Sequence, residues 1–349
     1  MKESFMSVVT IIGSGMMGSA LTVPLRYNAH EVRLVGTPLD GELIAGLKEN
    51  GFHKKLKRRL PEGVRYEYFE NAEKAIAGAD VIVGGVSSFG LDWFRSAVIP
   101  MLPEDVPVIS VTKGMIDMPD GMLVSYPEIY EQSTEKKISF NAIGGPSTSY
   151  ELADRDPTHV TFCGRDIETL RKLKAIFETP FYFISVSTDV RGVECAVAMK
   201  NAYALGVTLA VGLSHAREGR EIEHYNSQAA LFGQSVKEMT KLLELCGGGA
   251  DNLYLGIGDL YVTVFGGRSR KIGTLLGTGM EFDKAMDALA GVTLESVVIA
   301  GRTARAVKAL ASRGVVKTSD FPLLMHIGEL INQEKTVDIP WKAFESEKF

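Results

Sequence analysis

A glycine-rich turn near the start of the chain constrains the fold more than any other feature. Gly13, Gly15 and Gly18 follow the apolar, β-branched run Val8–Ile12, and Ser19–Leu25 has a helical pattern. A strand, this glycine spacing and then a helix form the arrangement in which backbone N–H groups hold a pyrophosphate. Gly13 allows the tight turn, Gly15 lets the backbone approach the phosphates, and Gly18 lets the helix pack on the strand. The sequence therefore predicts a dinucleotide site that also includes Ser14, Met16 and Met17; a purely structural turn is the alternative.

Further apolar runs predict a parallel sheet. They are separated by helical segments, as in a doubly wound α/β fold, and they comprise Glu31–Val35, Ala79–Val86, Pro107–Thr112, Ser139–Ile143, His159–Phe162 and Phe181–Val186. We therefore predict an N-terminal doubly wound Rossmann-type domain over residues 1–188. Longer helical periods follow, at Val190–Val211, Gln228–Leu245, Phe282–Leu289 and Leu294–Ala311. These predict a mostly α-helical C-terminal domain over residues 189–349.

Composition narrows the class of protein. The net charge of −5 argues against nucleic acid as a main partner. Three widely spaced cysteines fit a reducing compartment, and the six histidines show no metal-ligand spacing. The first residues do not resemble a signal peptide, and the longest apolar stretch, Ala202–Leu213, is shorter than the roughly 20 residues that span a bilayer. We expect a cytoplasmic protein without a membrane partner or a metal. The chain has 36 glycines, more than is usual for its length, and some of them lie at the expected ligand contacts.

The cofactor's ribose is normally read about 20 residues beyond the glycine turn. Val35 ends the second strand there, and Asp40 comes late. Neither an acid nor an arginine ends the strand, so the choice between NAD and NADP stays open. The basic segment His53–Arg59 is predicted to be a solvated loop, with phosphate binding as the alternative.

Two lysines are candidates for a role in ligand binding or catalysis. Lys113 follows a predicted strand, and ligands of open α/β sheets bind beyond the carboxyl ends of strands. Lys200 lies in the almost wholly apolar helical segment Cys195–Leu205, with no carboxylate three or four positions away. Because an unpaired buried ammonium is costly, its partner must come from another segment, or the lysine must face a cleft. A buried lysine suits proton transfer. The alternatives are an exposed loop lysine for Lys113 and a structural ion pair or a snorkelling side chain for Lys200.

Two glycine-framed segments could complete a site. Asp259, within Gly256–Thr263, could supply the carboxylate for Lys200. Gly266–Lys271 has the pattern of an anion-binding turn, in which Arg268 would bind a phosphate bidentately. The alternative for Gly256–Thr263 is a capped helix terminus, and the alternative for Gly266–Lys271 is a solvated basic turn.

In this order, the motifs resemble those of the NAD(P)-dependent glycerol-3-phosphate dehydrogenase family over nearly the whole chain. The matching residues are Gly13–Gly18, Lys113-Gly114, Gly145-Pro146-Ser147, Glu194 with Lys200-Asn201, Asn226, Ala229-Ala230, Glu238-Met239, Gly258-Asp259-Leu260 with Thr263, Gly266-Gly267-Arg268 with Arg270-Lys271, Gly291 and Glu295.

The resemblance implies an enzyme that interconverts sn-glycerol 3-phosphate and dihydroxyacetone phosphate with NAD or NADP, and it suggests a homodimer. It implies that Lys200 is the acid/base residue, assisted by Lys113 and Asp259. Substrate contacts would come from Lys113, Gly145, Ser147, Asn201, Thr263, Arg268 and Ser269. Lys113, Arg268 and Glu295 would join the glycine turn in binding the cofactor.

The sequence departs from the family pattern in places. Ser269 replaces an asparagine, and Thr148-Ser149-Tyr150 replaces a Phe-Ala pair. Both changes touch the expected substrate region, so a dehydrogenase acting on another small polyol phosphate or a hydroxy acid is the alternative function. A non-catalytic dinucleotide sensor would not need Lys113, Lys200 and Asp259 together. A binding scaffold would use the helical half for assembly.

Overall fold

The computed structural model describes residues 6–345, which pack as two compact units. Of these residues, the first unit comprises 6–113 and Ser125–Val193, and the second comprises Gly114–Val124 and 194–345. This division differs from the expected boundary at 188/189 in two places. The segment Gly114–Val124 packs with the helical half, and 189–193 stay with the sheet.

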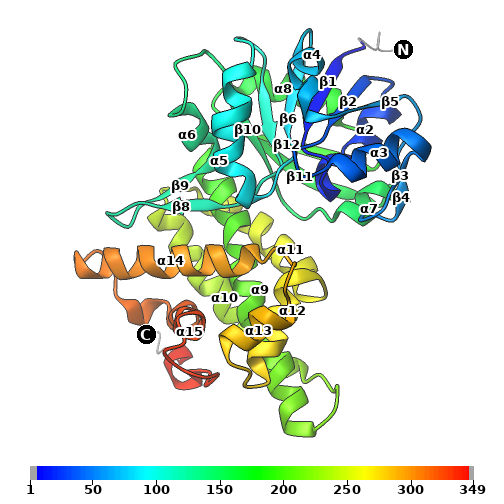
Figure 1. The fold of residues 1–349 in the computed structure, drawn as a ribbon. Helices are drawn as coiled ribbons and strands as arrows, with labels where there is room; N and C mark the ends of the chain where they lie inside the picture. The colour runs from blue at the N-terminus through cyan, green and yellow to red at the C-terminus, as the bar shows by residue number, and fades with distance from the viewer. Residues whose placement is uncertain (1–5, 346–349) are drawn as a thin grey trace. The chain divides into compact units, whose positions relative to one another are not determined.

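The first unit is built on an eight-stranded sheet (Figure 1). Its strand order is β12-β11-β10-β7-β6-β1-β2-β5, and every neighbouring pair is parallel except β10 with β11. The strands are β1 Val8–Ile12, β2 Glu31–Val35, β5 Val64–Glu67, β6 Val81–Gly84, β7 Val108–Ser110, β10 Phe140–Gly144, β11 Thr158–Cys163 and β12 Tyr182–Ser187. The predicted doubly wound α/β domain is therefore confirmed.

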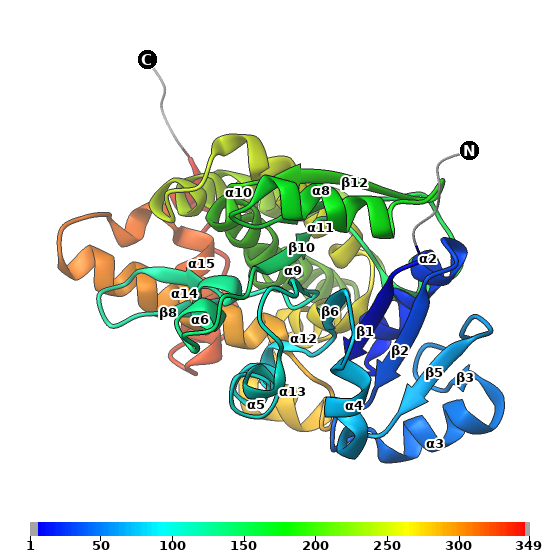
Figure 2. The same cartoon turned by 90° about the horizontal axis from the view of Figure 1, so that it is seen from above.

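Strand order places the glycine turn where a ligand is expected. From β1 the chain adds β2 and β5 on one side, shown together in Figure 2, and later β6, β7 and β10 on the other. Strand order thus reverses between β1 and β6, and such a switch point is where open α/β sheets bind ligands. Helices cover the sheet, namely α1 Met16–Ala20, α2 Thr22–Tyr27, α3 Gly41–Asn50, α4 Ala72–Ile76, α5 Leu91–Trp93, α6 Tyr126–Glu131, α7 Ser149–Ala153 and α8 Ile167–Phe177. A small hairpin, β3 Phe52–His53 with β4 Arg58–Arg59, follows α3.

The second unit is helical and packs around α9, Val190–Glu218. The other helices are α10 Tyr225–Leu245, α11 Leu253–Val264, α12 Gly267–Gly277, α13 Phe282–Ala288, α14 Glu295–Ser312 and α15 Pro322–Ile331. With 29 residues, α9 is long and apolar enough to cross a membrane. The shorter apolar stretch Ala202–Leu213 within it did not predict this, because it was judged by itself. However, 89% of its most apolar window is buried inside the protein, so it is a core helix here.

A two-stranded hairpin, β8 Met115–Asp117 with β9 Leu123–Ser125, explains the shifted boundary. In the second unit β8 lies beside α14, as Figure 1 shows. Arg305 Nε donates to Asp117 Oδ2 at 2.8 Å, and Arg302 donates to the carbonyl of Met115 at 3.1 Å. Because these contacts join residues almost 190 positions apart, no local pattern announces them.

Glycines also serve helix packing in the second unit. A Cβ at Gly273 or Gly277 of α12 would collide with the backbone of α9, and one at Gly212 of α9 would collide with α12. These positions hold glycine because two helix backbones approach closely there. Part of the glycine excess therefore reflects packing rather than ligand contacts.

Candidate functional site

The glycine turn has the geometry that its spacing predicts. Gly13 has a φ of +112°, and a Cβ there would lie 2.7 Å from the carbonyl group of Gly85. A Cβ on Gly18 would lie 2.5 Å from the carbonyl oxygen of Gly13. In contrast, a Cβ on Gly15 would meet only Gly85, at an ordinary 3.5 Å. Packing within the protein therefore requires glycine at positions 13 and 18, whereas position 15 leaves room for a ligand to approach the backbone.

A buried histidine holds this turn in place. His53 is fully buried, and its Nε2 lies 2.9 Å from the carbonyl oxygen of Ser14, while its Nδ1 accepts the backbone N–H of Leu56. The same Ser14 carbonyl accepts the hydroxyl of Ser19 at 3.2 Å. Burial lowers the pKa of His53, so a neutral ring donates from Nε2 and accepts at Nδ1. The expectation of a wholly solvated basic loop is wrong at His53 and Leu56, which are both buried.

Lys113 lies at the other side of the switch point, three residues after β7. Its Nζ donates to the carbonyl oxygen of Gly145 at 2.7 Å. This contact brings two of the predicted motifs, Lys113-Gly114 and Gly145–Ser147, together. Ser147 Oγ is buried and has no hydrogen-bond partner among residues 6–345. Its hydroxyl is therefore suited to a ligand.

Tyr150, one of the departures from the family pattern, contacts the glycine turn. Its hydroxyl lies 3.4 Å from Sδ of Met16, and its side chain is 43% exposed. The sequence placed this residue in the substrate region; the structure adds a contact with the predicted cofactor loop.

In the second unit, Lys200 has a carboxylate partner from another helix. Lys200 Nζ lies 2.9 Å from Asp259 Oδ1 and 3.0 Å from Thr263 Oγ1, both on α11. Thr263 donates its hydroxyl to the carbonyl oxygen of Asp259 at 2.6 Å, so it accepts from Lys200. The Lys200 side chain is 13% exposed and that of Asp259 is 1% exposed. The structure thus brings together three of the predicted site residues in a nearly dry cluster.

Close helix packing positions this cluster. Gly256 of α11 faces α9, where a Cβ would lie 2.5 Å from the carbonyl oxygen of Ala196. Asp259 comes about one turn after Gly256, and Lys200 comes about one turn after Ala196. The bare backbone at Gly256 therefore lets α11 approach α9 closely enough for the two side chains to meet. Asp259 lies in the middle of α11, Leu253–Val264, and not at a helix terminus.

Gly256→Ala is expected to destabilise the second unit by about 1–3 kcal/mol, because the methyl group overpacks the contact with α9. It should also displace Asp259 from Lys200 and lower activity. Amide hydrogen exchange in α9 and α11, together with kcat, checks both effects. The control is Gly233→Ala on an exposed face of α10, where no atom lies within 4 Å of the added Cβ. A wild-type exchange pattern in Gly256→Ala would contradict this account of the glycine.

The basic motif after α11 opens a helix. Gly267 has a φ of +84° and begins α12, so Arg268 lies in its first turn with its side chain 44% exposed. Arg268 Nη2 lies 3.4 Å from Oε2 of Glu295, the first residue of α14. Ser269 is buried, and Arg270 is occupied by Glu223 and the carbonyl of Val264. Arg268 is thus the arginine of this motif that can reach a ligand.

Asn201, next to Lys200, is 8% exposed. Its role as a substrate contact stays a prediction, as do the roles of the other site residues.

Comparison with known proteins identifies the family. The family model for the N-terminus of NAD-dependent glycerol-3-phosphate dehydrogenase matches residues 8–170, and the model for its C-terminus matches residues 189–341. The chain belongs to the NAD-dependent glycerol-3-phosphate dehydrogenase family. It is 34% identical to the NADP(+)-dependent glycerol-3-phosphate dehydrogenase of Archaeoglobus fulgidus over 284 residues, which cover 81% of this chain and 83% of that protein. It is 28% identical to a glycerol-3-phosphate dehydrogenase [NAD(P)+] of Koribacter versatilis, over 95% of this chain and 94% of that protein.

A solved structure supports the fold of this glycerol-3-phosphate dehydrogenase family member. The glycerol-3-phosphate dehydrogenase of Coxiella burnetii matches it with a TM-score of 0.80 and 22% identity, over 97% of this chain and 98% of that chain. Family membership makes the chain an oxidoreductase that acts on a CH–OH group with NAD or NADP.

The residues of the first unit fit such a cofactor. Besides the open backbone at Gly15, the side chain of Ser14 is buried, and its Oγ has no hydrogen-bond partner among the residues that the structure describes. A buried hydroxyl without a partner is costly and fits a site that a polar ligand completes. Residues Gly13–Gly18 would hold the pyrophosphate of the dinucleotide.

Sequence reasoning missed two polar residues beside these sites. His53 was hidden in a basic run, although its contact is with Ser14, 39 residues away. Ser296 follows Glu295 on α14; it is 1% exposed, and its Oγ has no partner among residues 6–345. The signal for Ser296 was its place next to a predicted cofactor residue at a helix start.

Proposed function

We propose that this protein interconverts sn-glycerol 3-phosphate and dihydroxyacetone phosphate, with Lys200 as the acid/base residue. The observation that carries the assignment of Lys200 is its pairing with Asp259 and Thr263. A lysine ammonium has three N–H bonds. Asp259 and Thr263 accept two of them at 2.9 and 3.0 Å, which leaves one for an oxygen atom of the substrate.

The chemistry divides between cofactor and protein. The nicotinamide cofactor, when bound, would supply the hydride that the carbonyl carbon of the ketone receives. Negative charge develops on the carbonyl oxygen, and the ammonium of Lys200 stabilises this charge and gives the oxygen its proton. The carboxylate of Asp259 accepts a hydrogen bond from the ammonium and holds it in place. In the reverse direction, neutral Lys200 takes the proton from the hydroxyl group.

Arg268 is proposed to bind the phosphate of the substrate or of the cofactor. Its long contact with Glu295 and its 44% exposure leave the guanidinium available to an anion. Asn201, Gly145, Ser147 and Ser269 are proposed as further substrate contacts, and Lys113 and Glu295 as contacts near the nicotinamide.

We place the enzyme in the cytoplasm, because its three cysteines are buried thiols spread along the chain and the apolar helix α9 is buried in protein. A homodimer is proposed from the family resemblance alone. A phosphorylated small molecule is the proposed partner, and neither nucleic acid nor membrane is expected.

A panel of ketones, with NADH and NADPH supplied separately, tests the function. We expect oxidation of the cofactor with dihydroxyacetone phosphate and little with unphosphorylated dihydroxyacetone or with keto acids. Turnover with a keto acid and none with dihydroxyacetone phosphate would favour the alternative dehydrogenase. Failure to oxidise either cofactor with any ketone would indicate a sensor.

A further inference from the structure

The turn after β2 gives no carboxylate to a ribose in the usual position. Strand β2 ends at Val35, and Gly36 and Thr37 follow. The first acid after β2 along the chain is Asp40, whose Oδ2 accepts both the backbone N–H of Thr37 at 2.9 Å and its hydroxyl at 2.8 Å. Asp40 therefore closes its own turn. An NAD site normally uses an acid here to bind the ribose 2′-hydroxyl, whereas an NADP site uses a cation for the 2′-phosphate.

A basic loop is anchored to the glycine turn. This loop, Lys54–Lys57, connects β3 to β4. Two residues anchor this loop. His53, just before it, is hydrogen-bonded to the carbonyl of Ser14, and Leu56, within it, is buried in the core of the first unit. Between these two anchors, Lys54 and Lys55 are exposed.

Lys55 is exposed and lies two residues after His53, whose ring is hydrogen-bonded to Ser14. Burial is the main cause of the lowered pKa of His53; among charged groups, Lys55 lowers it further and Asp40 raises it. Both charges thus lie within electrostatic reach of one ring. That ring is itself hydrogen-bonded to the turn expected to hold the pyrophosphate. The hydrogen bond between His53 and Ser14 therefore places the loop that carries Lys55 beside the glycine turn.

We propose that Lys55 binds the 2′-phosphate of NADPH, on a loop that His53 anchors to the glycine turn, and that the enzyme prefers NADPH to NADH. This rests on the proposed dinucleotide-dependent function and specifies its cofactor. The 2′-phosphate brings up to two negative charges to the end of β2, where Lys55 can neutralise one of them. NADH lacks these charges, and Oδ2 of Asp40 is already engaged by the backbone N–H and the hydroxyl of Thr37.

Direct binding tests the proposal without turnover. Dissociation constants for NADPH, NADH, adenosine 2′,5′-bisphosphate and 5′-AMP are measured on the full chain by calorimetry or by cofactor fluorescence. We expect NADPH to bind about tenfold or more tightly than NADH, and the bisphosphate to bind more tightly than 5′-AMP, as one charge-assisted contact implies. Added salt should weaken NADPH binding more than NADH binding.

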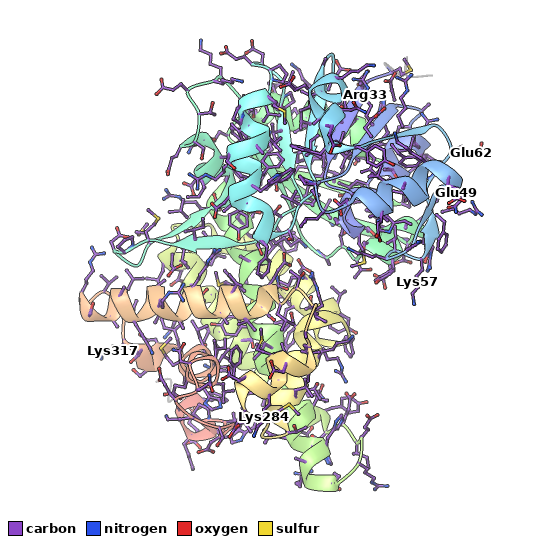
Figure 3. The ribbon with its side chains drawn as sticks, viewed as in Figure 1. Arg33, Glu49, Lys57, Glu62, Lys284 and Lys317 are labelled. Carbon is purple, nitrogen blue, oxygen red and sulfur yellow. The ribbon has the colours of Figure 1, made fainter. Side chains whose placement is uncertain are left out.

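Substitutions test whether Lys55 itself, and not the general charge of the loop, binds the 2′-phosphate. Lys55→Ala should raise the Kd for NADPH about tenfold and leave that for NADH within about twofold. The matched control is Lys57→Ala, which removes the same charge from the same loop at a side chain that points into solvent (Figure 3). It should change neither constant. His53→Gln, checked for folding by its melting temperature, should weaken both cofactors because it loosens the glycine turn itself.

The outcomes are distinguishable. Tighter binding of NADH than of NADPH, with a selective loss of NADH binding in Asp40→Asn, would show that Asp40 binds the ribose and would overturn the proposal. Equal losses in Lys55→Ala and Lys57→Ala would show diffuse charge rather than a site and would also overturn it. If neither dinucleotide binds, the proposed function itself fails.

Discussion

Lys200→Met is expected to lower kcat by about a hundred- to ten-thousand-fold while leaving the Kd for the reduced cofactor nearly unchanged. The size of the loss is that of a removed general acid. Methionine fills similar space but neither donates a proton nor stabilises charge on the substrate oxygen. The cofactor should be little affected because its predicted turn, Gly13–Gly18, lies in the other unit. Steady-state kinetics with dihydroxyacetone phosphate and direct cofactor titration measure the two quantities.

The control for this substitution is Lys284→Met, which removes an exposed lysine of α13 that pairs with Glu281 (Figure 3). It should behave like wild type. Partial recovery of Lys200→Ala by added ethylamine would identify the lost group as the amine, because a merely structural role is not restored by a free amine in this way. Unchanged turnover in Lys200→Met would refute the assignment of Lys200.

The central strands could be predicted from the sequence because burial on both faces produces continuous apolar runs. Val8–Ile12 and Glu31–Val35 match β1 and β2 in both bounds. The edge strand β5 was missed, since Val64–Glu67 carries charged and polar residues on its open side. The hairpin β8–β9 was missed for another reason. Its partner, α14, lies far along the chain, so only tertiary packing defines it.

The candidate site was predictable where a residue conflicts with its surroundings. Lys200 stood out because an ammonium in an apolar helix needs a partner, and Asp259 was a reasonable candidate for it. The helical state of α11 was not predictable, because Gly256 and Gly258 weaken a helix when considered locally. Close packing on α9 requires Gly256, and this packing outweighs the local cost. His53 was missed since its burial depends on a turn formed by a different segment.

A second large effect is expected in stability, because the Lys200–Asp259 pair is nearly dry. Removal of one partner from a buried ion pair typically costs about 3–5 kcal/mol, since the remaining charge loses its counter-ion in a poorly solvated place. Lys200→Met should therefore destabilise the second unit by about this amount, with the carboxylate of Asp259 only 1% exposed. Adding Asp259→Asn should recover much of the loss, because the double variant carries no charge at this pair.

Amide hydrogen exchange in α9 and α11 measures this effect locally. For a chain of two units, a local measurement is more informative than one global unfolding transition. The double-mutant cycle should give a large coupling energy between Lys200 and Asp259. The same cycle on the exposed pair Lys284–Glu281 serves as the control and should give a far smaller coupling, because solvent screens it. If the Lys200→Met and Asp259→Asn effects simply add, the pair is not a coupled buried unit. Asp259 would then have to position Lys200 by some means other than their shared charge.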